Sequence, residues 1–319
     1  MKIIVVGCGR WGSFIAWYLN HIGHDVTLYG RESSKNMCEL MATRKNSHIV
    51  LPDSIKLTNS LDEIKNAQSI IISINSQNLS TLMSEISKND IQNKKFVLCM
   101  KGIEIATGRR LSQIVCDSVD SSNSVSVWLG PGHVEELFQG TPNCMVIDSN
   151  DEAVKEELVI EFSSDLIRFY YGDDLIGNEI GAAAKNVIGI AAGMLDGLNL
   201  SSLKGSLMSR GTREVGRLIS AMGGKELSAY GLCHLGDYEA TVFSKFSHNR
   251  MFGEMFVKGE SFTQLAEGFY TVEALMVLKD KYEVELPICT AVYDVLYNGI
   301  EAKYALVKLF SRNNKKEFL

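Results

Sequence analysis

The sequence begins with a short apolar run that leads directly into a glycine-rich turn. Lys2 to Val6 is a continuous apolar and mostly β-branched run, which predicts a strand buried on both faces of a parallel sheet. The turn Gly7-Cys8-Gly9-Arg10-Trp11-Gly12 follows, and Trp11 to His21 then has the pattern of a helix. This order restricts the fold more than any other feature, because it predicts a βαβ unit with an anion-binding helix N-terminus.

The three glycines of this turn have G-x-G-x-x-G spacing, and each has a separate physical task. In such turns one glycine makes the tight bend, one lets the backbone approach a pyrophosphate, and one lets helix and strand pack closely. Glycines at this spacing also occur in purely structural turns, but here they follow a buried strand and open a helix. We therefore expect a dinucleotide cofactor at Gly7, Gly9, Arg10, Trp11 and Gly12.

The end of the second predicted strand, Asp25 to Tyr29, bears on the choice of cofactor. A site selective for NAD usually has an acidic residue there, which bonds the ribose hydroxyls. This chain has Gly30 and then Arg31, so a missing acid and an adjacent cation favour NADP. Glu32 weighs against this preference, and an exposed arginine without a role is the alternative. NADP is the predicted cofactor, and NAD stays an alternative.

Strand patterns and helix patterns occupy different parts of the chain. Up to about residue 175, strand-like runs alternate with polar or helical segments, which predicts a parallel, doubly wound sheet. Beyond it, apolar residues recur three and four apart. The predicted fold class is α/β, with an N-terminal Rossmann-type parallel sheet domain (residues 1–178), a C-terminal all-helical substrate-binding domain (residues 179–319) and a helix shared at the junction. The strand-like runs are Lys2–Val6, Asp25–Tyr29, Ser69–Ile74, Lys95–Met100, Ser124–Leu129 and Asn143–Ile147, and the helical segments are Ile176–Leu198, Leu203–Met222, Phe262–Tyr282 and Ile288–Ile300.

Composition and charge argue against several classes of function. The formal net charge of -6 argues against nucleic acid or an anionic membrane as the main partner. The seven cysteines form no C-x-x-C pair, so we expect neither a metal site nor a disulfide framework, and a reducing, cytoplasmic location instead. The most membrane-like stretch, Asn186 to Leu195, is about half as long as a membrane span. We therefore expect no membrane span.

Several motifs resemble one enzyme family. Asn178-Glu179-Ile180-Gly181-Ala182-Ala183-Ala184-Lys185-Asn186-Val187-Ile188, with its continuation to Leu198, resembles the signature of the NAD(P)-dependent sn-glycerol-3-phosphate dehydrogenases. The resemblance extends from Met1 to about Tyr297, and its motifs have the family's order along the chain. Further similar motifs are Met100-Lys101-Gly102, Gly130-Pro131, Ser209-Arg210-Gly211, Gly231-Leu232-Cys233-His234-Leu235-Gly236-Asp237, Asn249-Arg250 and Glu267-Gly268.

This resemblance implies hydride transfer between the nicotinamide and C2 of glycerol 3-phosphate or dihydroxyacetone phosphate. Oxidation of the alcohol needs a base, and the reverse reaction needs an acid. Lys185 matches the family's catalytic lysine, although a lysine at a helix end more often simply reaches solvent. Lys101 matches a second active-site lysine, and Asp237 matches an aspartate that would orient Lys185 or a substrate hydroxyl. Thr241 lies four residues after Asp237, on the same face if the segment is helical.

The resemblance also implies two wider sets of binding residues. A small phosphorylated substrate would contact Lys101, Gly130, Gly132, Lys185, Asp237, Thr241, Ser247, His248 and Asn249. In addition to the glycine turn and Arg31, the cofactor would contact Lys101, Val134, His248 and Glu267. Family habit and the apolar helical domain also favour a homodimer.

The sequence departs from the family at two of these positions. His248 stands where the family has an arginine that contacts the substrate phosphate, and Gly132 stands where a small polar residue or serine is common. Arginine is a permanent forked cation, whereas histidine titrates near neutral pH and offers at most two donors. His234 replaces a small residue of the family, and we expect it to be structural.

Three functions remain open at this point. In the first, His248 and Arg250 together still hold the phosphate of glycerol 3-phosphate, for glycerophospholipid metabolism. In the second, the altered phosphate end marks a paralogue that oxidises another small phosphorylated polyol or hydroxy compound. In the third, the chain is a nucleotide-binding sensor that has lost catalysis, against which Lys101, Lys185 and Asp237 argue.

Overall fold

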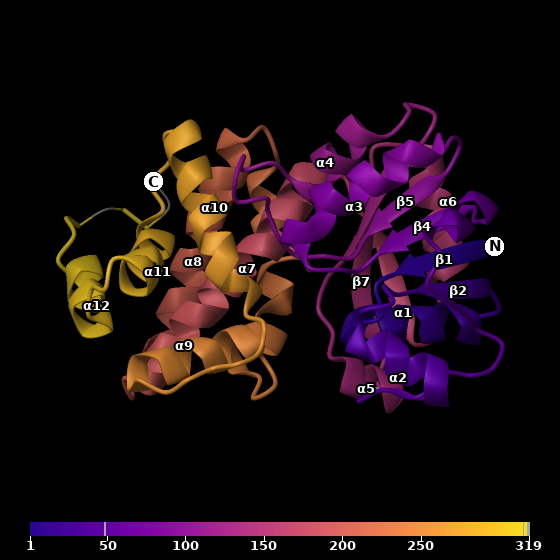
Figure 1. Cartoon of the computed structure of the whole chain (residues 1–319). Helices are drawn as coiled ribbons and strands as arrows, with labels where there is room; N and C mark the ends of the chain where they lie inside the picture. Colours follow the sequence, from indigo (N-terminus) through magenta and orange to yellow (C-terminus); the bar gives the residue numbers. More distant parts are fainter. Residues whose placement is uncertain (48, 315, 318–319) are drawn as a thin grey trace. The chain divides into compact units, whose positions relative to one another are not determined.

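The computed structural model describes residues 1–47, 49–314 and 316–317, and the chain divides into two compact units (Figure 1). Unit 1 comprises Met1–Lys101 and Arg109–Glu179, and unit 2 comprises Gly102–Gly108 and Ile180–Leu319. Helix α7 (Leu175–Gly197) crosses the boundary, so the predicted shared helix is present. Among the described residues, no helix combines the length and the apolar character that crossing a membrane requires.

Unit 1 is built on a sheet of eight strands within its described residues. The strand order is β3-β2-β1-β4-β5-β6-β7-β8, and all neighbours run parallel except β6 and β7. The strands are β1 (Lys2–Val6), β2 (Asp25–Tyr29), β3 (Lys56–Thr58), β4 (Ser69–Ile72), β5 (Lys95–Leu98), β6 (Ser124–Leu129), β7 (Asn143–Ser149) and β8 (Ile167–Tyr171). The prediction of an α/β fold with a mostly parallel sheet is therefore confirmed.

Three details of the sheet differ from the sequence prediction. The strands β3 and β8 were not predicted, because β3 has only three residues and β8 alternates buried and exposed side chains instead of being continuously apolar. One pair departs from the predicted parallel arrangement, since β7 runs antiparallel to β6. The connection between these two strands holds only the five-residue helix α5 (Val134–Phe138), whereas a parallel crossover normally contains a longer helix.

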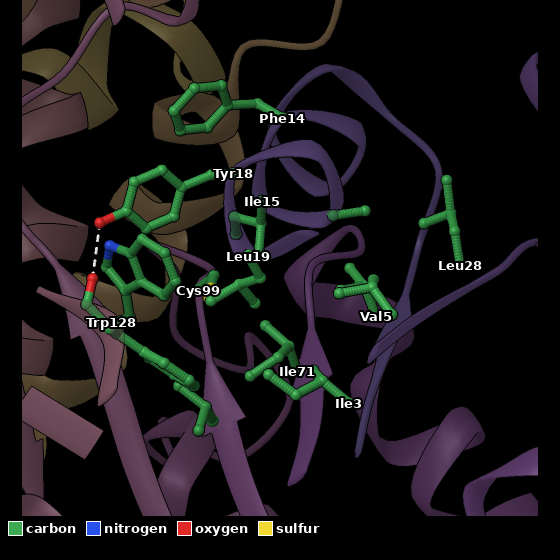
Figure 2. Close-up of a cluster of buried hydrophobic side chains, with 14 of the residues drawn as sticks. Ile3, Val5, Phe14, Ile15, Tyr18, Leu19, Leu28, Ile71, Cys99 and Trp128 are labelled. Carbon is green, nitrogen blue, oxygen red and sulfur yellow. Dashed lines mark hydrogen bonds between the residues drawn. The ribbon is translucent and has the colours of Figure 1, made fainter. Parts of the chain in front are cut away.

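Helices bury both faces of this sheet. Alternate residues of β1 point to opposite faces, and Ile3, Ile4, Val5 and Val6 are all at most 2% exposed. Figure 2 shows one face, where Ile15 and Leu19 from α1 (Arg10–His21) lie toward Ile3, Val5 and Ile71 of the strands, and Tyr18 lies beside Trp128. The other helices of unit 1 are α2 (Lys35–Thr43), α3 (Leu79–Ile86), α4 (Leu111–Ser118), α5 (Val134–Phe138) and α6 (Glu152–Phe162).

All the regular elements in the described residues of unit 2 are helices or helical turns. Helix α7 is almost entirely buried from Ile180 to Leu195, which explains its apolar sequence without a membrane. The other helices are α8 (Lys204–Ala221), α9 (His248–Lys258), α10 (Glu267–Lys281), α11 (Pro287–Tyr297) and α12 (Ala302–Phe310). Of these, α9 and α12 were not among the predicted helical segments, and α10 begins five residues later than the predicted Phe262.

The first turn of α7 is anchored within unit 1 by two residues of the signature. The Asn178 amide donates to Asp148 over 2.8 Å, and Glu179 accepts from the Ser112 amide and hydroxyl over 2.9 and 2.6 Å. Glu179 also pairs with Arg110, and both side chains are largely buried. These bonds fix the start of the helix that carries Lys185.

Candidate functional site: a glycine turn and a buried lysine cluster

The glycine turn at the end of β1 has the geometry that its spacing predicts. Gly7 has φ of +116°, and a Cβ there would lie 2.1 Å from the Ser73 carbonyl oxygen. At Gly12 a Cβ would lie 2.0 Å from the carbonyl oxygen of Gly7, so helix and turn touch through their backbones. A Cβ at Gly9 would meet nothing within 4 Å. The backbone at Gly9, the N-cap of α1, therefore faces open space, as a pyrophosphate-binding turn requires.

This turn lies at the point where the strand order of the sheet reverses. Strand β1 pairs with β2 on one side and with β4 on the other, so the chain leaves the centre of the sheet in both directions. Gly7 follows β1 and Ser73 follows β4, at the carboxyl ends of two adjacent parallel strands. Ligands of open α/β sheets bind in the crevice at such a switch point.

Arg10 and Trp11 connect this turn to its surroundings. The Arg10 guanidinium pairs with Glu135 of α5, the helix that begins with the buried Val134. Burial alone would raise the pKa of Glu135, but hydrogen bonds from its own backbone amide and from Arg10 hold that pKa below its ordinary value. Trp11 stacks on Phe14 with ring centroids 5.3 Å apart. The structure thus brings Arg10, Trp11 and the helix of Val134 to the glycine turn.

The end of β2 has no room for an acidic side chain at residue 30. A Cβ on Gly30 would lie 2.7 Å from the Cys8 Sγ and 2.8 Å from the Met37 side chain. Gly30 is buried, whereas the next residue, Arg31, is exposed. Packing around residue 30 therefore excludes an acidic side chain, and the first side chain after the strand is the exposed Arg31.

Lys101 and the loop after β6 also lie together in unit 1. The Lys101 Nζ donates to the carbonyl oxygen of Gly130 over 2.6 Å. Gly132 has φ of +157°, a backbone conformation that side chains rarely adopt. The departure from the family at this position therefore accompanies a glycine-specific loop conformation.

In unit 2, Lys185 lies at the centre of a buried polar cluster. Its Nζ is 2.6 Å from the Oδ2 of Asp237 and donates to the Thr241 hydroxyl over 2.8 Å. The side chains of Lys185 and Asp237 are 8% and 1% exposed, and Thr241 is 2% exposed as a residue. A lysine with these partners differs from a solvated lysine at a helix end, and it can exchange a proton while a carboxylate stabilises its ammonium form.

The local backbone explains how these three side chains meet. Asp237 ends a short 3-10 turn (Leu235–Asp237), and Thr241 lies in a π-helical turn (Glu239–Phe243). The segment is therefore not the α-helix on which the predicted shared face of Asp237 and Thr241 depends. The two turns together still direct both side chains to the same nitrogen of Lys185.

A row of glycines on α7 lets the neighbouring segments approach Lys185. Gly181 precedes Lys185 by four residues, and Gly189, Gly193 and Gly197 follow it at four-residue intervals. Because a turn has 3.6 residues, these positions form a stripe that winds slowly around the helix. A Cβ at Gly189 would lie 2.7 Å from the Thr241 methyl, and one at Gly193 would lie 1.9 Å from the Arg250 carbonyl oxygen. Backbone and small side chains of the facing segments therefore pack directly on the helix.

The start of α9 holds the other predicted residues of this unit. The Ser247 hydroxyl accepts the Arg250 amide and caps the helix, and the ring of His248 lies 3.3 Å from the Leu265 carbonyl oxygen. The Asn249 amide donates to Asn186, the neighbour of Lys185, and its oxygen accepts the amide of Gly268. Asn249 thus ties α9 to α7 and to the first turn of α10, which begins at Glu267.

Arg250 is engaged within the helical unit. Its Nε donates to the Ser244 carbonyl over 3.0 Å, and its Nη1 contacts Asp196 and Glu254 over 2.9 and 2.8 Å. The hypothesis that Arg250 helps His248 to hold a phosphate would require this guanidinium to leave two carboxylates. Two of the three guanidinium nitrogens of Arg250 therefore have partners inside the helical unit, and a phosphate site shared by His248 and Arg250 stays a prediction.

Sequence reasoning missed two residues beside the lysine cluster. His234 and Tyr238 are 0% exposed and hydrogen-bonded to each other over 2.7 Å, on either side of Asp237. His234 was expected to be structural, but no signal in the sequence linked it to Tyr238. The four-residue spacing of the pair was the only available indication, and it gains meaning only once the segment is known to be helical.

Unit 1 has a Rossmann-type sheet with an open glycine turn at its switch point, and unit 2 is helical with a buried lysine–aspartate pair. These features define a dinucleotide-binding protein of the two-domain α/β class. The profile of the NAD-dependent glycerol-3-phosphate dehydrogenase N-terminus matches residues 2–155, and that of the C-terminus of the same family matches residues 174–307. The chain belongs to the NAD-dependent glycerol-3-phosphate dehydrogenase family.

Individual relatives agree with this assignment. The chain is 32% identical to glycerol-3-phosphate dehydrogenase [NAD(P)+] of Pelodictyon phaeoclathratiforme, over 99% of each chain. It is 34% identical to the protein of that name from Bacillus anthracis, over 99% of this chain and 97% of the other. The crystal structure of glycerol-3-phosphate dehydrogenase from Coxiella burnetii superposes with a TM-score of 0.90 at 27% identity, covering 98% of this chain and 99% of the other. The similarity therefore covers both units.

Proposed function

We propose that the chain is an NAD(P)-dependent dehydrogenase that interconverts glycerol 3-phosphate and dihydroxyacetone phosphate. The observation that carries this proposal is the contact of Lys185 with Asp237 and Thr241, because it supplies a buried group for proton transfer. Relatives that share about a third of the sequence over the whole chain are named for this activity. In this proposal residues 1–178 form the domain that binds the cofactor, and residues 179–319 form the domain that binds the substrate.

The residues of the lysine cluster perform the proton transfer in this proposal. In the oxidation, the neutral amine of Lys185 removes the proton of the substrate hydroxyl while the C2–H bond breaks. The Asp237 carboxylate then stabilises the new ammonium, and Thr241 holds the Nζ in place. In the reduction, the same ammonium returns its proton to the oxygen at C2. The bound dinucleotide supplies the hydride acceptor or donor.

The cofactor is held by the glycine turn in this proposal. The open space at Gly9 fits a pyrophosphate, and the unpaired amides at the start of α1 favour its negative charge. Arg31 follows a strand end that is closed to an acidic side chain at Gly30, which supports a preference for the 2′-phosphate of NADP. NAD remains the alternative cofactor. Lys101, Val134, His248 and Glu267 complete the proposed contacts.

A second candidate substrate follows from the α9 segment. A histidine at residue 248 and an Arg250 bound to Asp196 and Glu254 offer less positive charge than the family's arginine. The same hydride transfer would then act on another small phosphorylated polyol or hydroxy compound. The proposed substrate contacts of Gly130, Gly132, Ser247 and Asn249 do not distinguish the two candidates. A homodimer and a cytoplasmic location complete the proposal.

A panel of small ketones tested with NADPH and with NADH separates these candidates. Rapid reduction of dihydroxyacetone phosphate supports the main proposal, and a clearly better second ketone supports the alternative. Lys185→Ala should lower kcat by about 10²–10⁴-fold while NADPH binding is retained. The matched control is Lys155→Ala, which removes another buried lysine, in α6 of unit 1, and should retain kcat. Unchanged turnover in Lys185→Ala would refute the lysine assignment.

A further inference from the structure

His234 is a fully buried imidazole that the proposed chemistry does not use. Its Nδ1 lies 2.8 Å from the carbonyl oxygen of Gly181, and its Nε2 lies 2.7 Å from the hydroxyl of Tyr238. A carbonyl oxygen can only accept, so Nδ1 carries the proton and donates it to Gly181. The Nε2 of the neutral ring must then accept the proton of the Tyr238 hydroxyl. One tautomer and one direction of hydrogen bonding follow from these two contacts.

These bonds join the Asp237 segment to the helix that carries Lys185. His234 and Tyr238 flank Asp237 in the chain, and Gly181 lies one helical turn before Lys185. In an α-helix the carbonyl of Gly181 also accepts the backbone amide of Lys185. The imidazole is therefore bonded to the turn from which Lys185 projects, while Asp237 contacts the end of the same lysine side chain.

We propose that His234 and Tyr238 are positioning residues, which set the position of Asp237 over α7 and thereby the orientation of Lys185 for proton transfer. This inference rests on the proposed function for its kinetic consequence. It assigns neither residue a contact with the substrate.

Close packing around both rings supports a positioning role. A Cβ at Gly181 would lie 3.1 Å from the Cβ of His234, which is closer than ordinary packing, so a larger residue there would displace the imidazole. A Cβ at Gly211 of α8 would lie 3.4 Å from the Tyr238 hydroxyl, and the Thr212 hydroxyl lies 3.5 Å from it. The pair is therefore enclosed between α7 and α8, and a change in either ring must be transmitted to the segment that holds Asp237.

The protonation state of the pair is stable near neutral pH. Burial, together with the positive charge of Lys185, lowers the pKa of His234 to about 4, although the bond to Gly181 and the charge of Asp237 oppose this shift. Burial also raises the pKa of Tyr238, and the titratable groups Cys289 and Glu214 raise it too, while the hydrogen bond with Thr212 opposes them. A neutral His234 adds no second positive charge beside Lys185, and the hydrogen bonds keep their direction.

The test uses two substitutions that change the pair in different ways. Tyr238→Phe removes the donor to Nε2, and it should lower kcat for dihydroxyacetone phosphate by about 10-fold or more while the Kd for NADPH is unchanged. It should also move the half-maximal pH of glycerol 3-phosphate oxidation to lower values, because a displaced Asp237 favours the ammonium form of Lys185 less. Adding His234→Asn, which keeps a donor toward Gly181 without a ring Nε2, should restore part of kcat. Tyr297→Phe is the control, since it removes a tyrosine hydroxyl bond elsewhere in unit 2.

A glycine pair separates positioning from stability. Gly181→Ala places a methyl group 3.1 Å from His234 and should lower kcat, and a Tm at or near the wild-type value would show that this loss does not come from unfolding. Gly205→Ala, in α8 with nothing within 4 Å of the new methyl, should leave kcat unchanged. Wild-type kcat and pH dependence in both Tyr238→Phe and Gly181→Ala would overturn the proposal. An inactive wild-type chain would instead refute the proposed function, and the Nδ1–H tautomer of His234, measured by ¹⁵N NMR, would still test the geometry.

Discussion

The carboxylate of Asp237 lies 2.6 Å from the ammonium of Lys185, and these side chains are only 1% and 8% exposed. Two opposite charges at this depth lose most of their hydration, and their mutual attraction compensates only while both are present. The pair therefore affects stability as well as chemistry, and each effect can be measured separately.

Removal of one charge of this pair should destabilise the fold. Asp237→Ala leaves a buried ammonium without its counter-ion and should lower the free energy of unfolding by about 3–5 kcal/mol. The double variant Lys185→Met with Asp237→Leu should recover most of this loss, although it has no activity. Urea denaturation measures both values. Asp62→Ala, in a pair with side chains 51% and 74% exposed, is the control and should change stability by about 1 kcal/mol or less. Equal losses in both alanine variants would contradict the argument.

Restoring the family's arginine should reveal which substrate the site prefers. His248→Arg places a permanent forked cation at the start of α9, and a charged hydrogen bond to a phosphate contributes about 1.5–3 kcal/mol. If the missing cation limits the reaction, kcat/KM for dihydroxyacetone phosphate should rise about 10-fold or more. The measurement is steady-state kinetics with a non-phosphorylated ketone as control. No gain for the phosphate ester would count against this explanation.

Arg31 should decide the preference for NADPH. Arg31→Ala should raise the KM for NADPH about 10-fold and leave the KM for NADH nearly unchanged, because only NADPH carries the 2′-phosphate. Lys35→Ala, which removes another exposed cation from the start of α2, is the matched control. Equal effects on both cofactors would show that Arg31 does not read the phosphate.

Acidification should act on stability through His234. The folded pKa of about 4 lies below the ordinary value of 6.5, so between these values the unfolded state binds a proton that the folded state excludes. The stabilising contribution is present above 6.5 and is lost as the pH falls toward 4. Its size is about 3 kcal/mol. Wild type and His234→Asn, compared by urea denaturation across this range, should diverge in pH dependence. Parallel curves would contradict the burial of a neutral ring.

Glu214 should act in the opposite direction. Burial raises its pKa from 4.5 to about 7, although its carboxylate accepts the amides of Ile288 and Cys289 at the start of α11. The folded state therefore binds a proton before the unfolded state does, and stability from this group rises as the pH falls from about 7 to 4.5. Glu214→Gln should remove this gain and leave a variant that loses stability on acidification more steeply than wild type. A variant with the wild-type pH dependence would refute this assignment.

The sheet was largely predictable because its central strands are continuously apolar and several of them end at glycines. The edge strand β8 was not predicted, and β7 was predicted as a strand but not as an antiparallel one. Strand direction depends on how the chain returns and not on the pattern of the strand itself. The glycine turn was predictable from spacing, because each glycine answers a local steric need. At Gly30 the sequence shows only that an acid is missing, because the packing of Cys8 against this residue arises from the folded structure.

The lysine cluster was predictable only through resemblance to a family. Asp237 and Thr241 lie more than fifty residues from Lys185, and they meet it through a 3-10 turn and a π-helical turn that no periodicity indicates. The bond between His234 and Tyr238 was not foreseen, because a residue that departs from the family pattern has no inherited role. The sequence therefore predicted features that depend on neighbouring residues, but it did not predict which distant segments come together.

The glycine row of α7 has a consequence for how this helix can vary. The facing segments contact the helix at Gly181, Gly189, Gly193 and Gly197. These contacts fix the rotation of α7 about its own axis at several points along its length. A single larger residue on this face would turn the helix and displace Lys185 even from two turns away. In a saturation mutagenesis scan of α7, substitutions should therefore reduce activity most at positions four residues apart, and Lys185 is one of these positions.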